Sequence, residues 1–259
     1  MKKLVYALRF LTVIPIRWKE NEDLAQVARS ISLFPLVGFI IGLSVFAVFR
    51  SSSLFFSDLF SSVFAVVWWI FITGGLHLDG LADTADGVWG GTTKERRLEI
   101  MKDSCTGVFG VVTLISFILM KTVAINELGT LDSIHQFSFL VTAPVHGRWI
   151  SVLTIYSFQT AREDGLGSFF REHIGIREVI IAFSITLIVS VVFSGLAGLL
   201  ILIAVTVLSS LGALFFSSRL GGLTGDIYGA LCESVELITL LLGFILFSTG
   251  AFTWLNSIL

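Results

Sequence analysis

The chain has 259 residues, of which 55% are hydrophobic and 14% are charged, and its net charge is -2. Soluble domains carry about 25% charged residues, so this composition, with a mean hydropathy of +0.92, predicts an all-α polytopic membrane protein. The small net charge and the lack of a basic stripe exclude nucleic acid as a partner. The two cysteines, Cys105 and Cys232, are far apart and indicate neither a disulfide framework nor a zinc site. We expect one integral membrane domain over residues 1–259.

The first apolar segment, residues 4–14, is too short to cross a bilayer and ends at Pro15. It predicts a short interfacial or re-entrant helix. Lys2, Lys3 and Arg9 supply positive charge here, but no long apolar stretch with a small-residue cleavage site follows. We therefore expect no removable signal peptide.

Longer apolar runs follow, and a helix needs roughly 20 such residues to cross a bilayer. We predict seven spans, at residues 32–49, 59–76, 107–125, 136–157, 178–195, 197–216 and 237–255. Basic residues collect in the loops on one side of these spans, whereas Arg50 is the clear basic residue on the other side. The positive-inside rule then places the N-terminus and the polar loops in the cytoplasm.

Three aspartates follow the second predicted span, within the glycine-containing run 74–87. Asp79, Asp83 and Asp86 are spaced i, i+4 and i+7, so a helix places them on one face. Like charges at this spacing need a counter-ion, and a hard divalent cation such as Mg²⁺, shared with a substrate phosphate, supplies it. The alternative is a solvated acidic loop beside the membrane.

Two further polar residues flank this run. His77 precedes Asp79 by two positions, and its ordinary pKa near 6.5 suits a general base for a hydroxyl nucleophile. The alternative for His77 is a polar residue at a helix interface. Asp103, which precedes the third predicted span, either caps that helix or joins the metal site, and capping is the common use of aspartate at this position.

Arg148 lies inside the fourth predicted span, shortly after Pro144. A guanidinium at this depth needs a partner, and its rigid fork matches a phosphate or a carboxylate. We predict that Arg148 holds a diphosphate substrate or pairs with an aspartate. A structural salt bridge is the alternative.

Two glycine-rich segments, 161–167 and 221–230, allow backbone amides to approach phosphates closely, although glycine also marks ordinary turns. Residues 74–79 and 221–226 share a Gly-Gly-Leu-x-x-Asp frame. This weak echo suggests an internal repeat with the site between its halves. Asp226, Glu233 and Glu236 repeat the carboxylate theme and allow a second metal or substrate subsite.

Several segments together carry a resemblance to a known family. They are 9–15, 75–87, 101–104, 147–149, 161–162 with 165–167, and 221–230. In this order they resemble the cobalamin synthases, also called adenosylcobinamide-GDP ribazoletransferases, of bacterial vitamin B12 assembly. The resemblance covers nearly the whole chain, without a clear departure in these motifs.

The resemblance implies a Mg²⁺-dependent transfer in the bacterial cytoplasmic (inner) membrane, with the active site facing the cytoplasm. α-Ribazole or its 5′-phosphate attacks adenosylcobinamide-GDP, which yields adenosylcobalamin or its phosphate and releases GMP. Metal ligation is then expected of Asp79, Asp83, Asp86 and Asp103, substrate binding of Arg148, Arg162, Gly165, Gly167, Thr224, Asp226 and Tyr228, and catalysis of His77, Asp83 and Arg148. The oligomeric state stays open.

Other membrane proteins also use aspartate clusters. The CDP-alcohol phosphotransferase pattern fails, because Asp79-Gly80-Leu81-Ala82 continues into Asp83-Thr84. A prenyltransferase-like enzyme, which has aspartate-rich motifs on two helices, agrees better with the sequence, because Asp79 to Asp86 and Asp226 could form such a pair. Such an enzyme would release pyrophosphate. A cation-coupled transporter would place its carboxylates near the bilayer midplane, whereas these collect at the cytoplasmic edge.

Overall fold

The computed structural model describes residues 2–16, 24–162 and 165–248. Apart from an isolated bridge between Thr160 and Leu223, the regular structure in these residues is helical, which confirms the all-α prediction. The helices are α1 (Lys2–Leu11), α2 (Leu24–Arg29), the 3-10 turn η1 (Ser30–Leu33), α3 (Phe34–Ser52), α4 (Asp58–Thr73), α5 (Leu76–Gly90), α6 (Lys94–Ile100), α7 (Val108–Leu128), α8 (Ser133–Ser157), α9 (Leu166–His173), α10 (Ile176–Leu220) and α11 (Gly225–Ser248).

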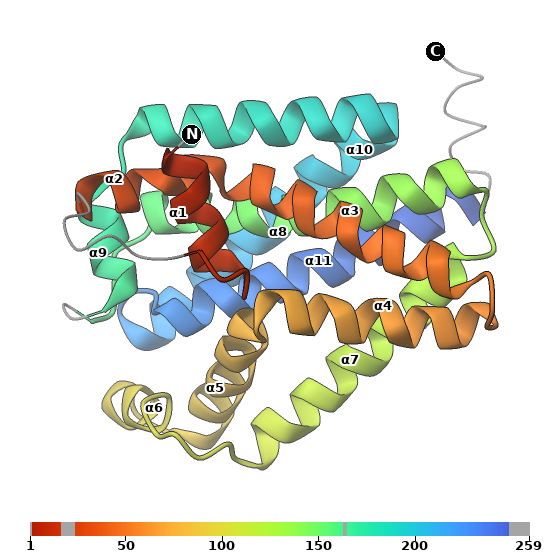
Figure 1. The fold of residues 1–259 in the computed structure, drawn as a ribbon. Coiled ribbons are helices and arrows are strands. Elements are labelled where there is room, and N and C mark those ends of the chain that lie inside the picture. Colours follow the sequence, from red (N-terminus) through yellow and green to blue (C-terminus); the bar gives the residue numbers. More distant parts are fainter. Residues whose placement is uncertain (1, 17–23, 163–164, 249–259) are drawn as a thin grey trace.

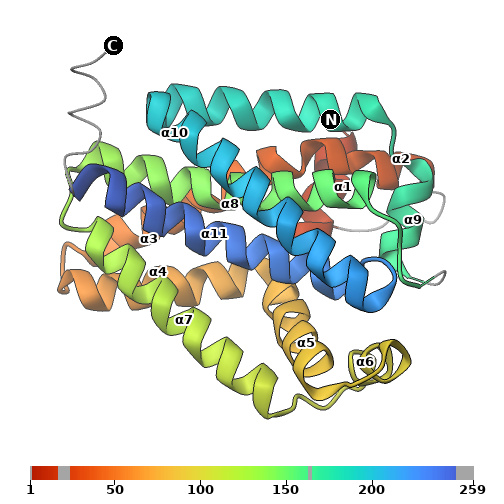
Figure 2. The same ribbon diagram turned by 180° about the vertical axis from the view of Figure 1, so that it is seen from behind.

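Helix α8 forms the centre of the bundle. It packs against α3, α10 and α11, and nearly all of its residues from Gln136 to Ile155 are buried. The axes of helices α3, α4, α8 and α11 are roughly aligned, with α4 and α8 running opposite to α3 and α11, while α7 crosses them obliquely (Figures 1 and 2). Helices α5 and α6 project from one end of this bundle, and α9 lies toward the same end (Figure 1).

Four described stretches are long and apolar enough to cross a membrane: Leu24–Ser52, α7, α10 and α11. Helix α4 meets this criterion only together with α5, as a pair bent by 91°. The predicted runs 32–49 and 107–125 fall in α3 and α7, and the run 136–157 falls in α8, which is helical but more polar. The coarse prediction of several apolar spanning helices is therefore confirmed.

Helix α10 contains both of the predicted runs 178–195 and 197–216. Gly195, with φ 55° and ψ -138°, breaks it into two halves, and the second half folds back across the bundle (Figure 2). This backbone conformation is readily available to glycine and not to other residues.

The last predicted run began too late. Helix α11 starts at Gly225 rather than at residue 237. Its N-terminal half includes Glu233 and Glu236, which are buried and paired inside the bundle. Residues 249–255 of that prediction lie outside the described residues.

The N-terminal segment is helical, as expected, over Lys2–Leu11. It is amphipathic, with Tyr6, Ala7 and Leu11 buried against the bundle. Both cysteines are free: Cys105 is exposed and Cys232 is buried.

Candidate active site

The acidic helix α5 begins at a sharp turn of the chain. Gly74 and Gly75, with φ 62° and 68°, adopt the left-handed conformation that favours glycine. They end α4 and turn the chain by 91° into α5. Because of this turn, α5, which carries Asp79 and Asp83, does not continue the direction of α4.

A second pair of glycines brings α5 onto α11. A Cβ atom at Gly80 would lie 2.7 Å from the backbone oxygen of Asp226, and one at Gly229 would lie 3.1 Å from the backbone oxygen of His77. Such close backbone contact places Asp226 beside the acidic face of α5. The two segments with the Gly-Gly-Leu-x-x-Asp frame thus lead into helices that cross each other, although an internal duplication stays a prediction.

The pKa of the Asp83 carboxyl reflects how close these aspartates lie to one another. Burial, followed by the negative charges of Asp79, Asp226 and Asp86, raises this pKa to about 6, while Arg162 acts in the opposite direction. Asp79 is exposed and Asp83 is half-buried. Three carboxylates from two helices therefore share a small region in which negative charge is poorly compensated.

Asp86 has a different role from its two neighbours on α5. Its side chain is buried, and its two oxygens accept the backbone N–H groups of Gly107 at 2.7 Å and Gly110 at 2.8 Å. Asp86 therefore caps the N-terminus of α7. Of the two alternatives predicted for Asp103, capping of this helix is wrong, because the side chain of Asp103 accepts the N–H of Cys105, two residues further on, at 3.0 Å.

No three His, Cys, Asp or Glu side chains in the described part of the chain are grouped tightly enough to hold a metal ion by themselves. Mg²⁺ usually keeps several waters and takes one or two carboxylates together with substrate phosphates. The oxygen donors of Asp79, Asp83 and Asp226 suit that open mode of binding. The oxygens of Asp86 already accept backbone hydrogen bonds.

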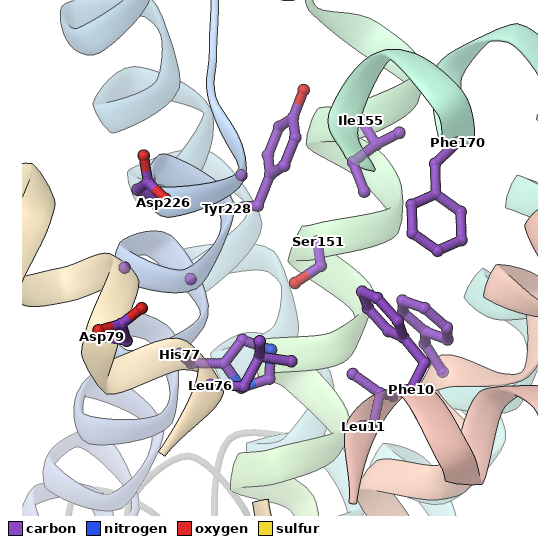
Figure 3. A pocket seen from close by; sticks show the side chains of 15 residues that line it. Phe10, Leu11, Leu76, His77, Asp79, Ser151, Ile155, Phe170, Asp226 and Tyr228 are labelled. Carbon is purple, nitrogen blue, oxygen red and sulfur yellow. The ribbon is translucent and has the colours of Figure 1, made fainter. Parts of the chain in front are cut away.

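A cavity of about 150 Å³ lies next to this acidic region. Its polar wall carries His77, Asp79 and Asp226, while the opposite wall is apolar (Figure 3). Tyr228 and Gly167, both predicted to bind substrate, also line it. The cavity is therefore mainly apolar, with its polar groups on one side.

A second cavity, of about 180 Å³, adjoins the first, because Gly167, Gly225 and Asp226 line both. Its wall also contains Arg162, Gly165 and Thr224, which were predicted to bind substrate. Arg148, predicted to do the same, lines neither cavity.

The two glycine-rich segments meet at this second cavity. Backbone hydrogen bonds join Ala161 N–H to Leu223 O and Leu223 N–H to Gln159 O, both at 2.8 Å. The guanidinium of Arg162 lies 3.7 Å from the Asp226 carboxylate. A cation and glycine-rich backbone thus converge in an arrangement that suits a phosphate group.

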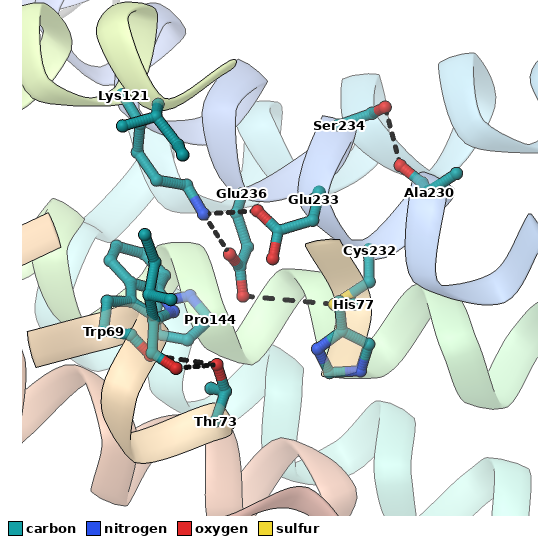
Figure 4. Close-up of polar contacts among 12 residues, drawn as sticks. Trp69, Thr73, His77, Lys121, Pro144, Ala230, Cys232, Glu233, Ser234 and Glu236 are labelled. Carbon is teal, nitrogen blue, oxygen red and sulfur yellow. Dashed lines mark hydrogen bonds and ion pairs between the residues drawn. The ribbon is translucent and has the colours of Figure 1, made fainter. Parts of the chain in front are cut away.

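A buried network of charges lies behind the site, and the sequence analysis missed its central cation. Lys121 on α7 contacts Glu233 at 2.7 Å and Glu236 at 2.6 Å, and its Nζ lies 4.2 Å from the ring centre of Trp69 (Figure 4). Arg148 on α8 pairs with the other oxygen of Glu236. Two cations and two carboxylates therefore balance inside the bundle. The available signal was Lys121 itself, a lone cation in the apolar run of the third predicted span.

Arg148 is fully buried. Its partner is Glu236, not one of the aspartates. The structure therefore shows the structural salt bridge that was the alternative prediction for Arg148. Arg148 also reaches His77, with 3.4 Å between Nη2 and Nδ1. Because a guanidinium only donates, Nδ1 of His77 acts as the acceptor, and the proton of the neutral imidazole lies on Nε2. This arrangement favours His77, which lines the cavity, as a hydrogen-bond donor over a general base.

These features define a helical membrane protein with an acidic, phosphate-compatible site at one end of its bundle. The model of the family cobalamin-5-phosphate synthase matches residues 3–245, and the chain belongs to this family.

Similar proteins include the adenosylcobinamide-GDP ribazoletransferase of Roseiflexus sp. (strain RS-1), 38% identical over 234 residues that cover 90% of this chain and 86% of the relative. The enzymes of that name from Herpetosiphon aurantiacus (38% identity, covering 93% of this chain and 95% of the relative) and Citrobacter koseri (36% identity, 93% and 99%) are also similar. No solved structure matches the chain.

Proposed function

We propose that this chain transfers α-ribazole or its 5′-phosphate onto adenosylcobinamide-GDP and releases GMP, in the assembly of cobalamin. The family match and the names of the relatives support this reaction. The structural observation that carries it is the approach of Asp79, Asp83 and Asp226 to Arg162 beside two glycine-rich segments. This is a combination suited to a diphosphate and a divalent cation.

The reaction exchanges one bond to phosphorus for another. A ribose hydroxyl of the ribazole bonds to the phosphorus that carries cobinamide, and the bridging P–O bond of the diphosphate breaks. GMP leaves with the electron pair of that bond, and the hydroxyl proton passes to a carboxylate of the site. Enzymes accelerate such transfers mainly by alignment and by compensating charge.

The residues of the site divide this work between them. Asp79, Asp83 and Asp226 are the proposed ligands of Mg²⁺, which when bound neutralises charge on the diphosphate and on the departing GMP. Arg162 binds phosphate oxygens in the second cavity. His77, held by Arg148, donates a hydrogen bond from Nε2 into the first cavity, and Arg148 positions His77 without touching the substrate.

We infer seven membrane spans for this chain in the inner membrane, with the N-terminus and the active site on the cytoplasmic side. Helix α8 has 25 residues, about 37 Å of helix, which is sufficient to cross a bilayer. The break at Gly195 divides α10 into two spans. The remaining spans are α3, α4, α7 and α11, and the basic loops support the orientation.

Incubating the purified protein with adenosylcobinamide-GDP, α-ribazole 5′-phosphate and Mg²⁺ tests this function. We expect GMP and the joined corrinoid in equal amounts, and neither when one substrate is omitted. Pyrophosphate in place of GMP would indicate a prenyltransferase-like enzyme. Uptake of a substrate by proteoliposomes without GMP would indicate a transporter.

A further inference from the structure

The cavity beside the acidic helix α5 has an aromatic wall, and the reaction described above assigns no role to this wall. Phe10 of α1, Phe34 of α3 and Phe170 of α9 meet there, with ring centres 5.1 to 5.9 Å apart. Phe34 and Phe170 are buried. Three helices distant in sequence thus build one aromatic surface.

The charges lie on the other side of this cavity. Asp79 and Asp226 face it from α5 and α11, whereas Leu11, Ile155 and the phenylalanine rings form the opposite wall (Figure 3). A ligand that fills the cavity therefore needs a flat apolar part at one end and a polar part at the other. Aromatic walls favour a flat ring, which stacks or meets them edge-on.

Three groups of the two substrates compete for this space. At about 150 Å³ the cavity is smaller than the roughly 300 to 1,000 Å³ of sites that enclose a whole drug-sized ligand, so a corrin macrocycle is too large. Guanine is flat, but its edge carries several donors and acceptors, and burying them against phenylalanine without partners costs free energy. The benzimidazole of ribazole is flat, bicyclic and largely apolar.

We propose that this cavity is the binding site for the benzimidazole base of the ribazole, with Phe10, Phe34 and Phe170 as its aromatic wall. This inference rests on the proposed function and adds the location of one substrate. The ribose attached to the base then points toward Asp79 and Asp226. The diphosphate of the other substrate occupies the neighbouring cavity at Arg162, and the two substrates meet at Asp226, which borders both cavities.

The substitution Phe10→Ala tests this assignment, because Phe10 lines the cavity and is less deeply buried than its two partners. We expect the KM for α-ribazole 5′-phosphate to rise about 10-fold, which corresponds to about 1.4 kcal/mol of lost binding, and the KM for adenosylcobinamide-GDP to stay within about twofold. Phe10→Leu, which keeps an apolar side chain but removes the ring, should give a smaller rise in the same KM.

Phe39→Ala is the matched control. Phe39 contacts Phe193 with ring centres 5.6 Å apart, in a separate cluster away from the cavity, and its loss should leave both KM values unchanged.

A second substrate sharpens the test. The wild-type protein should prefer the riboside of dimethylbenzimidazole over that of unsubstituted benzimidazole, and Phe10→Ala should reduce this preference, which a general loss of folding would not do.

The inference is overturned if Phe10→Ala and Phe10→Leu leave the ribazole KM unchanged, or raise only the KM for adenosylcobinamide-GDP, while the wild-type protein releases GMP. If the wild-type protein releases no GMP, the proposed function itself fails.

Discussion

Two groups of charged side chains lie close together in this chain and differ in how their charges are compensated. In the buried network, Lys121 and Arg148 balance Glu233 and Glu236 through contacts as short as 2.6 Å. In the acidic site, carboxylates from α5 and α11 crowd together, and Asp83 responds with a raised pKa. Balanced charges hold helices in place, whereas crowded like charges favour the binding of a cation, which we propose for the acidic site. Removing one charge should therefore have opposite effects on stability in the two regions.

The largest expected effect is in the network. Glu236→Gln leaves the buried charges of Arg148 and Lys121 without their shared carboxylate, so we expect unfolding in detergent to require about 3–5 kcal/mol less free energy. Glu99→Gln is the control, because Glu99 forms an exposed pair with Arg96 at 2.8 Å and its loss should change stability by less than about 1 kcal/mol. Equal changes in the two variants would contradict the structural role of the network.

Removal of the cation addresses the acidic site. After chelation we expect GMP release to fall by at least about 100-fold, and added Mg²⁺ should restore it. The network contains its own counter-ions, so the fold should survive chelation, which circular dichroism would check. Full activity in chelator would show that the carboxylates serve another purpose.

Arg162→Ala should produce a moderate effect confined to one substrate. Loss of the guanidinium from the second cavity should raise the KM for adenosylcobinamide-GDP about 10-fold, with little change for the ribazole. Arg96→Ala, on exposed α6, serves as the control. A rise in the ribazole KM alone would reverse the assignment of the two cavities.

Asp86→Ala should have the smallest effect on the protein. It separates the capping role of Asp86 from the metal-binding role proposed for Asp79 and Asp83. Loss of the cap of α7 should lower the free energy of unfolding by about 1–2 kcal/mol, while the Mg²⁺ concentration for half-maximal activity stays the same. Asp132→Ala, which removes the cap of α8, should cost a similar amount. A large shift in the Mg²⁺ requirement of Asp86→Ala would return Asp86 to the metal site.

The sequence predicted the helical class and the acidic face of α5 because both follow from local patterns. It could not separate Asp86 from Asp83, since the difference arises from the amides of Gly107 and Gly110, more than 20 residues away. The approach of Asp226 to α5 likewise depends on a close helix crossing at Gly80. The repeated Gly-Gly-Leu-x-x-Asp frame was the only local hint of it.

The buried network shows a similar limit. The position of Arg148 deep in an apolar run predicted that it needs a charged partner. Aspartate and glutamate offer the same carboxylate group, so the sequence alone could not identify Glu236 as that partner. Lys121 was overlooked because one cation changes the hydropathy of a long apolar run very little. Their pairing follows from the packing of α7, α8 and α11.

The most direct test of the contrast between the two regions is the rate of GMP release by Asp83→Asn protein that is shown to be folded. The raised pKa of Asp83 means that its ionised form weakens the folded state at pH 7. The amide should therefore leave the free energy of unfolding unchanged or raise it by up to about 1 kcal/mol, after allowance for solvent screening. We predict that GMP release falls at least about 100-fold in this stable protein. Full Mg²⁺-dependent release by Asp83→Asn would contradict the account.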